Sequence, residues 1–239
     1  WFSTFSIGCH LVLVFQKSYL TLLGKGILEN KLIVDEALEK LRVALLEIKD
    51  ELNKIGCNDL VFIATESLRI AKNTDDVFKI VEEIFPGTNV TILNQEMEGE
   101  MFFKTVSQAF INTPIVAIDI GGGSVQIFQG VYDSSTNIHR AIEKQLHKTG
   151  TYKLQQKYSP DNNVISDNFH LAVDEVTNEY EKLNIKNDIL VFGSTCMKDF
   201  IKETGIELHY DKPYKNHDFY VLRDSLVELL SEIRKFPPS

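Results

Sequence analysis

The sequence predicts a two-domain α/β fold, and three observations lead to that prediction. The length of 239 residues is enough for one large or two small domains. β-forming apolar runs alternate with helical periodicities along the chain, which is typical of α/β proteins. Pro114 interrupts this pattern, and the segment on each side begins with β-structure. We therefore expect domains over residues 1–114 and 115–239, with a ligand cleft between them.

The expected elements of the first domain follow from residue spacing. A β-forming apolar run predicts one strand over 5–15. Apolar residues then recur every three or four positions over 34–55, which predicts a long helix that ends at Gly56. The remaining elements are strands over 60–64 and 90–93 and helices over 65–71, 75–85 and 96–110.

The expected elements of the second domain begin with a buried strand that ends near Asp119. A β-rich stretch runs on to residue 132, and a further strand is expected over 138–143. The rest alternates again, with helices over 149–158 and 166–183, a strand over 188–192, a helix that begins at 193–195, and an amphipathic helix over 220–235.

The segment 116–127, VAIDIGGGSVQI, is the most informative part of the chain. It predicts a buried strand, a glycine-rich turn and a returning strand. Glycines allow backbone amides to point into one concavity that holds a phosphate, and Asp119 is a suitable ligand for a divalent cation. The segment lacks the Lys of a Walker loop and the spaced glycines of a dinucleotide fingerprint. An ordinary hairpin turn is the alternative interpretation.

Composition restricts the classes of partner. The formal net charge of −9 argues against a nucleic-acid duplex, because duplex binding depends on Lys and Arg near the phosphates. Cys9, Cys57 and Cys196 form no CxxC pair, which argues against structural zinc and favours reduced thiols. No apolar run is as long as a membrane span, and no signal peptide is recognisable. We therefore expect a cytoplasmic protein with no membrane partner.

Four segments together resemble the exopolyphosphatase / guanosine pentaphosphate phosphohydrolase family. They are LGKGI at 23–27, ATESLRIAKN at 64–73, NQEMEGE at 94–100 and DIGGGS at 119–124. Their order and spacing agree with the family from about residue 19 onward. The resemblance covers the two-domain core and implies an actin-like, sugar-kinase-like (ribonuclease H-like) α/β fold with mixed sheets and an interdomain cleft.

The resemblance also implies roles for individual residues. Glu98 is expected to act as general base, and Asp119 to hold Mg²⁺. Arg69 is expected to neutralise developing charge or to grip the phosphate with its planar guanidinium. The phosphate-binding residues that it implies are Gly8, Gly121, Gly122, Gly123, Ser124, Gly193, Ser194 and Thr195. The substrate would be inorganic polyphosphate or a guanosine nucleotide, and family members are often homodimers.

Simpler roles stay open for several of these residues. Glu96, Glu98 and Glu100 are also suitable as solvated acids at the start of a helix. Arg69 has Glu66 within reach as an ion-pair partner. Ser194 or Thr195 is suitable as a helix cap.

The first phosphate loop departs from the family pattern. The family has an aspartate where this chain has Ser6, and a serine supplies no carboxylate to a cation. His10 is the nearest replacement, and neutral imidazole is a poor magnesium ligand. Three functions therefore remain: a magnesium-dependent phosphoanhydride hydrolase, a catalytically impaired phosphate- or nucleotide-binding regulatory protein, and a kinase-like enzyme of the same fold.

Overall fold

The computed structural model describes residues 3–7, 10–15, 17–159, 168–180, 189–193 and 224–225. Contacts divide the chain into two compact units, Trp1–Asn94 and Gln95–Ser239. The sequence-based boundary at 114/115 lies further along the chain, because helix α5 (Gln95–Ser107) packs on strands of the second unit. Contacts thus place the segment 95–114 with the second unit.

The first unit begins with a β-hairpin. Strands β1 (Ser3–Ile7) and β2 (His10–Phe15) pair antiparallel, and Ile7 lies opposite His10. The prediction of one strand over 5–15 is wrong, because the chain reverses after Ile7 and the two segments satisfy each other's backbone hydrogen bonds.

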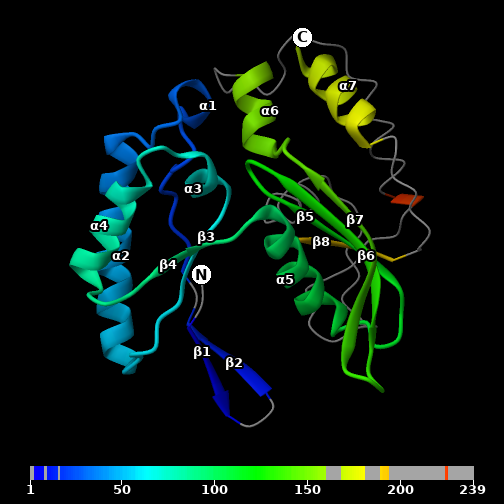
Figure 1. Ribbon diagram of the computed structural model, residues 1–239, viewed down its shortest axis with the longest axis horizontal. Coiled ribbons are helices and arrows are strands. Elements are labelled where there is room, and N and C mark those ends of the chain that lie inside the picture. Colours follow the sequence, from blue (N-terminus) through cyan, green and yellow to red (C-terminus); the bar gives the residue numbers. More distant parts are fainter. Residues whose placement is uncertain are drawn as a thin grey trace. The chain divides into compact units, whose positions relative to one another are not determined.

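The rest of the first unit is mainly helical (Figure 1). Its elements are α1 (Ile27–Asn30), α2 (Asp35–Ile55), β3 (Phe62–Ala64), α3 (Glu66–Ile70), α4 (Thr74–Ile84) and β4 (Val90–Ile92). The predicted long helix is confirmed as α2, which ends at Gly56 with a φ of 68°, a left-handed cap that suits glycine. Its apolar stripe packs with α4 around a core that includes Leu45, Leu52, Val77 and Ile80.

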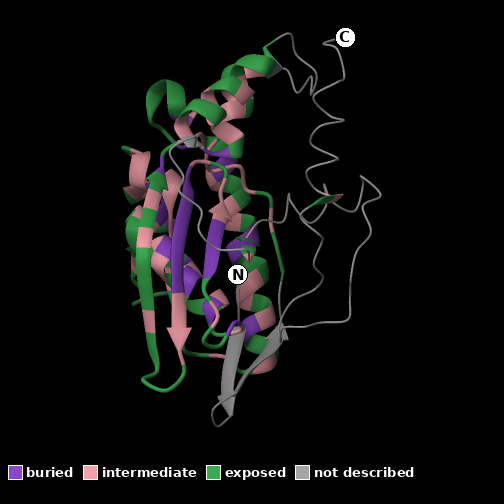
Figure 2. Cartoon of the chain, turned by 90° about the vertical axis from the view of Figure 1, so that its right-hand side faces the viewer, coloured by how far each residue is buried: buried purple, intermediate pink, exposed green. Residues whose placement is uncertain are grey.

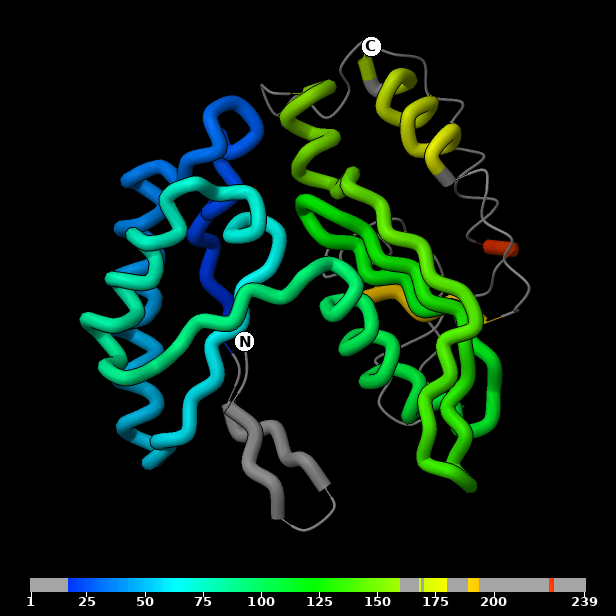
Figure 3. The backbone as a smooth tube through the Cα atoms, in the orientation of Figure 1, coloured from blue at the N-terminus to red at the C-terminus, as the bar shows by residue number. Residues whose placement is uncertain are grey.

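The second unit contains a four-stranded mixed sheet of order β7-β6-β5-β8 (Figures 1 and 3). The strands are β5 (Ile115–Ile120), β6 (Val125–Asp133), β7 (Ile138–His147) and β8 (Leu190–Gly193). β5 pairs antiparallel with β6 and parallel with β8, and β6 pairs antiparallel with β7. The predicted strand–turn–strand around the glycines is confirmed.

Both faces of the central strands are buried, as the colours of Figure 2 show. On one face, α5 packs with Phe103 against Phe128, whose ring centroid lies 6.1 Å away. The other face is a cluster of Val116, Ile118, Val125 and Ile127. Residues 115, 117 and 119 alternate onto the α5 face, so Asp119 extends from the covered face at the end of β5.

Two helices lie between β7 and β8 in the chain, α6 (Thr151–Tyr158) and α7 (Phe169–Tyr180). They are joined through Glu175 of α7, which binds Lys157 and Tyr158 of α6. The helix predicted over 220–235 lies almost entirely outside the described residues. In the part of the chain that the structure describes, every helix is too short or too polar to cross a membrane.

Candidate functional site

The glycine turn between β5 and β6 is held from one side by helix α6. Inside the turn, the amide of Gly121 donates to the carbonyl of Ser124 at 2.9 Å. The first amides of α6 then donate to the turn: Thr151 to the Gly121 carbonyl at 3.1 Å and Tyr152 to the Gly122 carbonyl at 2.8 Å. The N-terminus of α6 therefore binds the turn itself.

This arrangement fixes the direction of the next two amides. In a trans planar peptide the N–H points opposite to the C=O of the same unit. Because the Gly121 and Gly122 carbonyls face α6, the amides of Gly122 and Gly123 point away from it. Within the described part of the chain, neither of these two amides donates a hydrogen bond. Adjacent amides that point the same way are suitable for binding an anion.

Close approach explains two of the glycines here. A Cβ at Gly150 would lie 2.5 Å from the carbonyl carbon and oxygen of Gly122, which is too close for any side chain. A Cβ at Gly122 would lie 3.3 Å from the Cβ of Tyr152. Among the described glycines, positive φ occurs at Gly26, Gly56 and Gly87. The close approach of α6 to the turn thus requires glycine at position 150, whereas a Cβ at position 122 would need a small shift of Tyr152.

Helix α5 places Glu98 next to the turn. Gln95, at the start of α5, donates from Nε2 to the carbonyls of His147 at 2.7 Å and Val125 at 3.3 Å. One turn later, a Cβ at Gly99 would lie only 2.3 Å from Cε2 of Phe128. The helix therefore begins at the first residue of β6 and the last residue of β7, and its backbone packs against the sheet at Gly99. This packing brings the neighbouring residue, Glu98, close to the strands.

The three acids at the start of α5 have different surroundings. Glu96 pairs with Lys144 of β7, and Glu100 pairs with Lys104 at 2.7 Å. Both side chains are about half exposed, at 50% and 47%. Glu98 is half-buried and accepts a hydrogen bond from Gln126. Of the three, Glu98 alone is directed to the polar group beside the glycine turn.

Gln126 of β6 links Glu98 to the turn. Its Nε2 donates to Ser124 Oγ at 2.9 Å and to Glu98 Oε2 at 3.4 Å. The side chain is only 2% exposed. Gln126 was not predicted as a site residue, although a glutamine between Val125 and Ile127 in a buried strand indicates a polar contact in the core.

Asp119 lies beside this group. It pairs in register with Gln126 across the β5–β6 ladder, so the two side chains are neighbours on one face. Burial, and then the charge of Glu98, raise the pKa of Asp119 from 3.8 to about 6. Glu98 and Asp119 are thus both neighbours of Gln126, Glu98 through a hydrogen bond and Asp119 through the strand register.

Two acidic side chains at this site, Asp119 and Glu98, are candidate ligands for a cation. In the described part of the chain, no cluster of three or more His, Cys, Asp or Glu residues is arranged to hold a metal. Two carboxylates nevertheless suit Mg²⁺, which keeps several waters and binds one or two carboxylates together with substrate phosphates. The raised pKa of Asp119 fits the same role, because a cation beside it would relieve the repulsion from Glu98.

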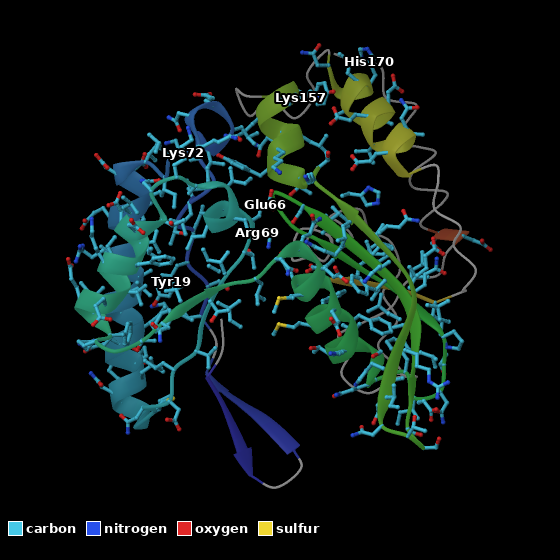
Figure 4. The ribbon with its side chains drawn as sticks, viewed as in Figure 1. Tyr19, Glu66, Arg69, Lys72, Lys157 and His170 are labelled. Atoms are coloured by element: carbon cyan, nitrogen blue, oxygen red, sulfur yellow. The ribbon has the colours of Figure 1, made fainter. Side chains whose placement is uncertain are left out.

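Arg69 lies in the first unit, on α3. Its guanidinium contacts Glu66 at 2.8 Å and donates to the carbonyl of Leu93 at 2.8 Å; Figure 4 labels this arginine and its glutamate. The side chains of Arg69 and Glu66 are 15% and 19% exposed. The alternative of an ion pair with Glu66 is thus confirmed, although the pair is largely buried. The phosphate-binding role stays a prediction.

The other predicted phosphate contacts are only partly described. Gly8, Ser194 and Thr195 lie outside the described residues, and so do the side chains of Ser6 and His10. Gly193 ends β8 opposite Asp119. A Cβ at Gly193 would lie 2.4 Å from Cε2 of Phe102, so packing against α5 accounts for glycine at this position.

Comparison with known proteins adds a family and relatives. The model of the Ppx/GppA phosphatase family matches residues 6–217. The guanosine-5'-triphosphate,3'-diphosphate pyrophosphatase of Pseudoalteromonas translucida is 25% identical over 213 residues, which cover 86% of this chain and 41% of that protein. Exopolyphosphatase 2 of Mycobacterium tuberculosis is 24% identical over 146 residues, 56% of this chain and 46% of that protein. The chain thus spans less than half the length of both relatives.

Solved structures show the same fold. An exopolyphosphatase from Cytophaga hutchinsonii has a TM-score of 0.65 at 18% identity, over 84% of this chain and 64% of that one. A Ppx/GppA family member from Aquifex aeolicus has a TM-score of 0.68 at 18% identity, over 95% of this chain and 72% of that one. These similarities confirm that the chain has the α/β fold of Ppx/GppA proteins, as the family resemblance implied.

Proposed function

Because the chain belongs to the Ppx/GppA phosphatase family, we propose that it hydrolyses phosphoanhydrides and releases terminal phosphate from inorganic polyphosphate or guanosine pentaphosphate. The observation that carries this proposal is the linked group of Glu98, Gln126 and Ser124 beside Asp119. It combines a carboxylate base, a hydroxyl and adjacent backbone amides within a few residues of a half-buried acid.

In the proposed reaction, the amides of Gly122 and Gly123 bind oxygens of the terminal phosphoryl group. Glu98 orients a water and accepts its proton while the water oxygen bonds to phosphorus. The bond from phosphorus to the bridging oxygen breaks, and the shortened phosphate chain leaves with the electron pair. Enzymes catalyse phosphoryl transfer mainly by positioning the reactants and neutralising charge, and this small set of groups supplies both functions.

The proposal includes Mg²⁺, held by Asp119 with Glu98 nearby. When bound, the cation would neutralise charge on the phosphate oxygens. Asp119 has a pKa of about 6, so it is mostly ionised at pH 7 and available as an oxygen ligand. Arg69 is a further proposed contact to phosphate.

We also propose the homodimer that the family resemblance implies. Sedimentation of the purified protein tests this oligomeric state.

Two substrate classes take priority in the assay. The relatives' names refer to guanosine-5'-triphosphate,3'-diphosphate and to polyphosphate. Ser6 favours a second candidate function, a regulatory protein that binds these ligands without turnover, because a family aspartate is missing there. Phosphate release and ligand-induced stabilisation distinguish the two functions.

The test compares two variants of one helix that make the same chemical change. Glu98→Gln removes the proposed base, and Glu100→Gln removes a half-exposed acid two residues away. Phosphate release from each substrate is measured with Mg²⁺ and after chelation. We expect Glu98→Gln to lose ~10²–10⁴-fold in kcat and Glu100→Gln to stay within about twofold of the unmodified protein.

The outcomes separate the hypotheses. Release that needs Mg²⁺ and depends on Glu98 supports the hydrolase. Thermal stabilisation by either substrate without any release supports the binding protein instead. Full activity in folded Glu98→Gln removes Glu98 as the base.

A further inference from the structure

Gln126 occupies the position where α5, β5 and the glycine turn meet. It is 2% exposed, and it lies directly opposite Asp119 in the β5–β6 ladder. A buried amide without hydrogen-bond partners destabilises a protein, so the partners of this amide are under strong constraint. The identity of these partners therefore bears on the role of Gln126.

The partners of Gln126 are two residues with proposed functions. Its Nε2 donates to Ser124 Oγ at 2.9 Å and to Glu98 Oε2 at 3.4 Å. The amide group carries two hydrogens, one for each acceptor. One planar group thus connects the proposed base on α5 to the hydroxyl that ends the glycine turn. Because Ser124 Oγ accepts this bond, its own O–H is directed away from Gln126.

Packing restricts the conformation of Gln126. A Cβ added to Gly99 would lie 2.8 Å from Cβ and 3.1 Å from Cγ of Gln126. The backbone of α5 therefore lies directly over the first two carbons of the glutamine side chain. A side chain confined in this way has few rotamers available, so its amide is held in one place.

We propose that Gln126 is a positioning residue that sets the distance between Glu98 and the phosphate-binding turn. This inference rests on the proposed function. During hydrolysis, the proton acceptor and the phosphoryl group must hold the water in line with the bond that breaks. A displacement of ~1 Å costs up to ~10²-fold in rate. Gln126 itself does not contact the substrate in this proposal.

The kinetic test uses a matched pair of buried glutamines on β6. Gln126→Leu removes both hydrogen bonds at similar size. Gln129→Leu makes the same change at a residue that is 5% exposed and bonds Glu143 of β7. We expect Gln126→Leu to lower kcat ~10–100-fold with KM within about twofold. We expect Gln129→Leu to leave kcat within about twofold.

A second measurement needs no activity. The side-chain amide signal of Gln126 in an NMR spectrum is assigned by its loss in Gln126→Leu. We expect this signal to shift in Glu98→Gln and in Ser124→Ala, because both partners of the amide change. We expect no shift in Glu100→Gln, which alters an acid paired with Lys104.

The two measurements distinguish failure of this inference from failure of the proposed function. If the protein turns over and depends on Glu98, an equal kcat in Gln126→Leu and Gln129→Leu overturns the positioning role. If the protein shows no turnover, the proposed function fails, and the amide signal decides. If the chemical shift of the Gln126 amide is unchanged in both Glu98→Gln and Ser124→Ala, the inference is overturned.

Discussion

Replacing Gly99 by alanine tests how α5 lies on the sheet. The added Cβ would be 2.3 Å from Cε2 of Phe128 and 2.8 Å from Cβ of Gln126. Carbon atoms pack comfortably at ~3.5–4.0 Å, so the helix must move away by ~1 Å or Phe128 must change its rotamer. Phe128 is 2% exposed and stacks on Phe103, which leaves little room for that change.

Two terms of opposite sign give the expected magnitude. Overpacking of this severity costs ~3 kcal/mol. Alanine is ~1 kcal/mol better than glycine inside a helix, which offsets part of the cost. We therefore expect Gly99→Ala to lower the free energy of unfolding by ~2 kcal/mol. Since Glu98 is the adjacent residue, we also expect phosphate release to fall by up to ~10²-fold.

Urea unfolding followed by far-UV circular dichroism measures the stability change. Met101→Ala is the control, because Met101 lies on the same helix and is 47% exposed. We expect the control to change stability by no more than ~0.5 kcal/mol. A Gly99→Ala protein that is more stable than the unmodified one by ~1 kcal/mol, the helix propensity alone, would refute the close packing of α5 on β6.

Three further predictions concern Asp119, Gly150 and Arg69. Asp119 has a pKa near 6 when folded and 3.8 when unfolded, so the ionised form disfavours folding and stability should fall as pH rises from about 4 to about 6. Asp119→Asn should remove this fall, ~1–2 kcal/mol after allowance for solvent screening, in urea titrations across that pH range; an unchanged pH profile contradicts the shift. Gly150→Ala should push α6 from the Gly122 carbonyl and weaken pyrophosphate binding about fivefold by calorimetry, since about one hydrogen bond to the turn is lost. Arg69→Ala should destabilise the protein by ~2 kcal/mol in thermal or urea unfolding, because it removes the largely buried guanidinium that contacts Glu66 and the Leu93 carbonyl, and Arg69→Met with Glu66→Leu should recover most of it.

Local sequence signals were sufficient for most of the secondary structure. The apolar spacing of α2 and its glycine cap depend on residues a few positions apart, so the sequence predicted both. The same holds for the strand–turn–strand around Asp119. The hairpin β1–β2 was missed, because a continuous β-forming run does not reveal where the chain reverses.

Residue order alone shows that an acid, three glycines and a hydroxyl lie between two apolar, strand-forming segments. Periodicity also placed Glu96, Glu98 and Glu100 on one helix, but the choice of Glu98 came only from the family resemblance. Tertiary structure decided which acid turns toward the sheet, because Gly99 meets Phe128 and Gln95 is anchored on His147. It also decided the raised pKa of Asp119 and the partners of Gln126. These properties depend on burial and on groups distant in sequence, which only packing brings together.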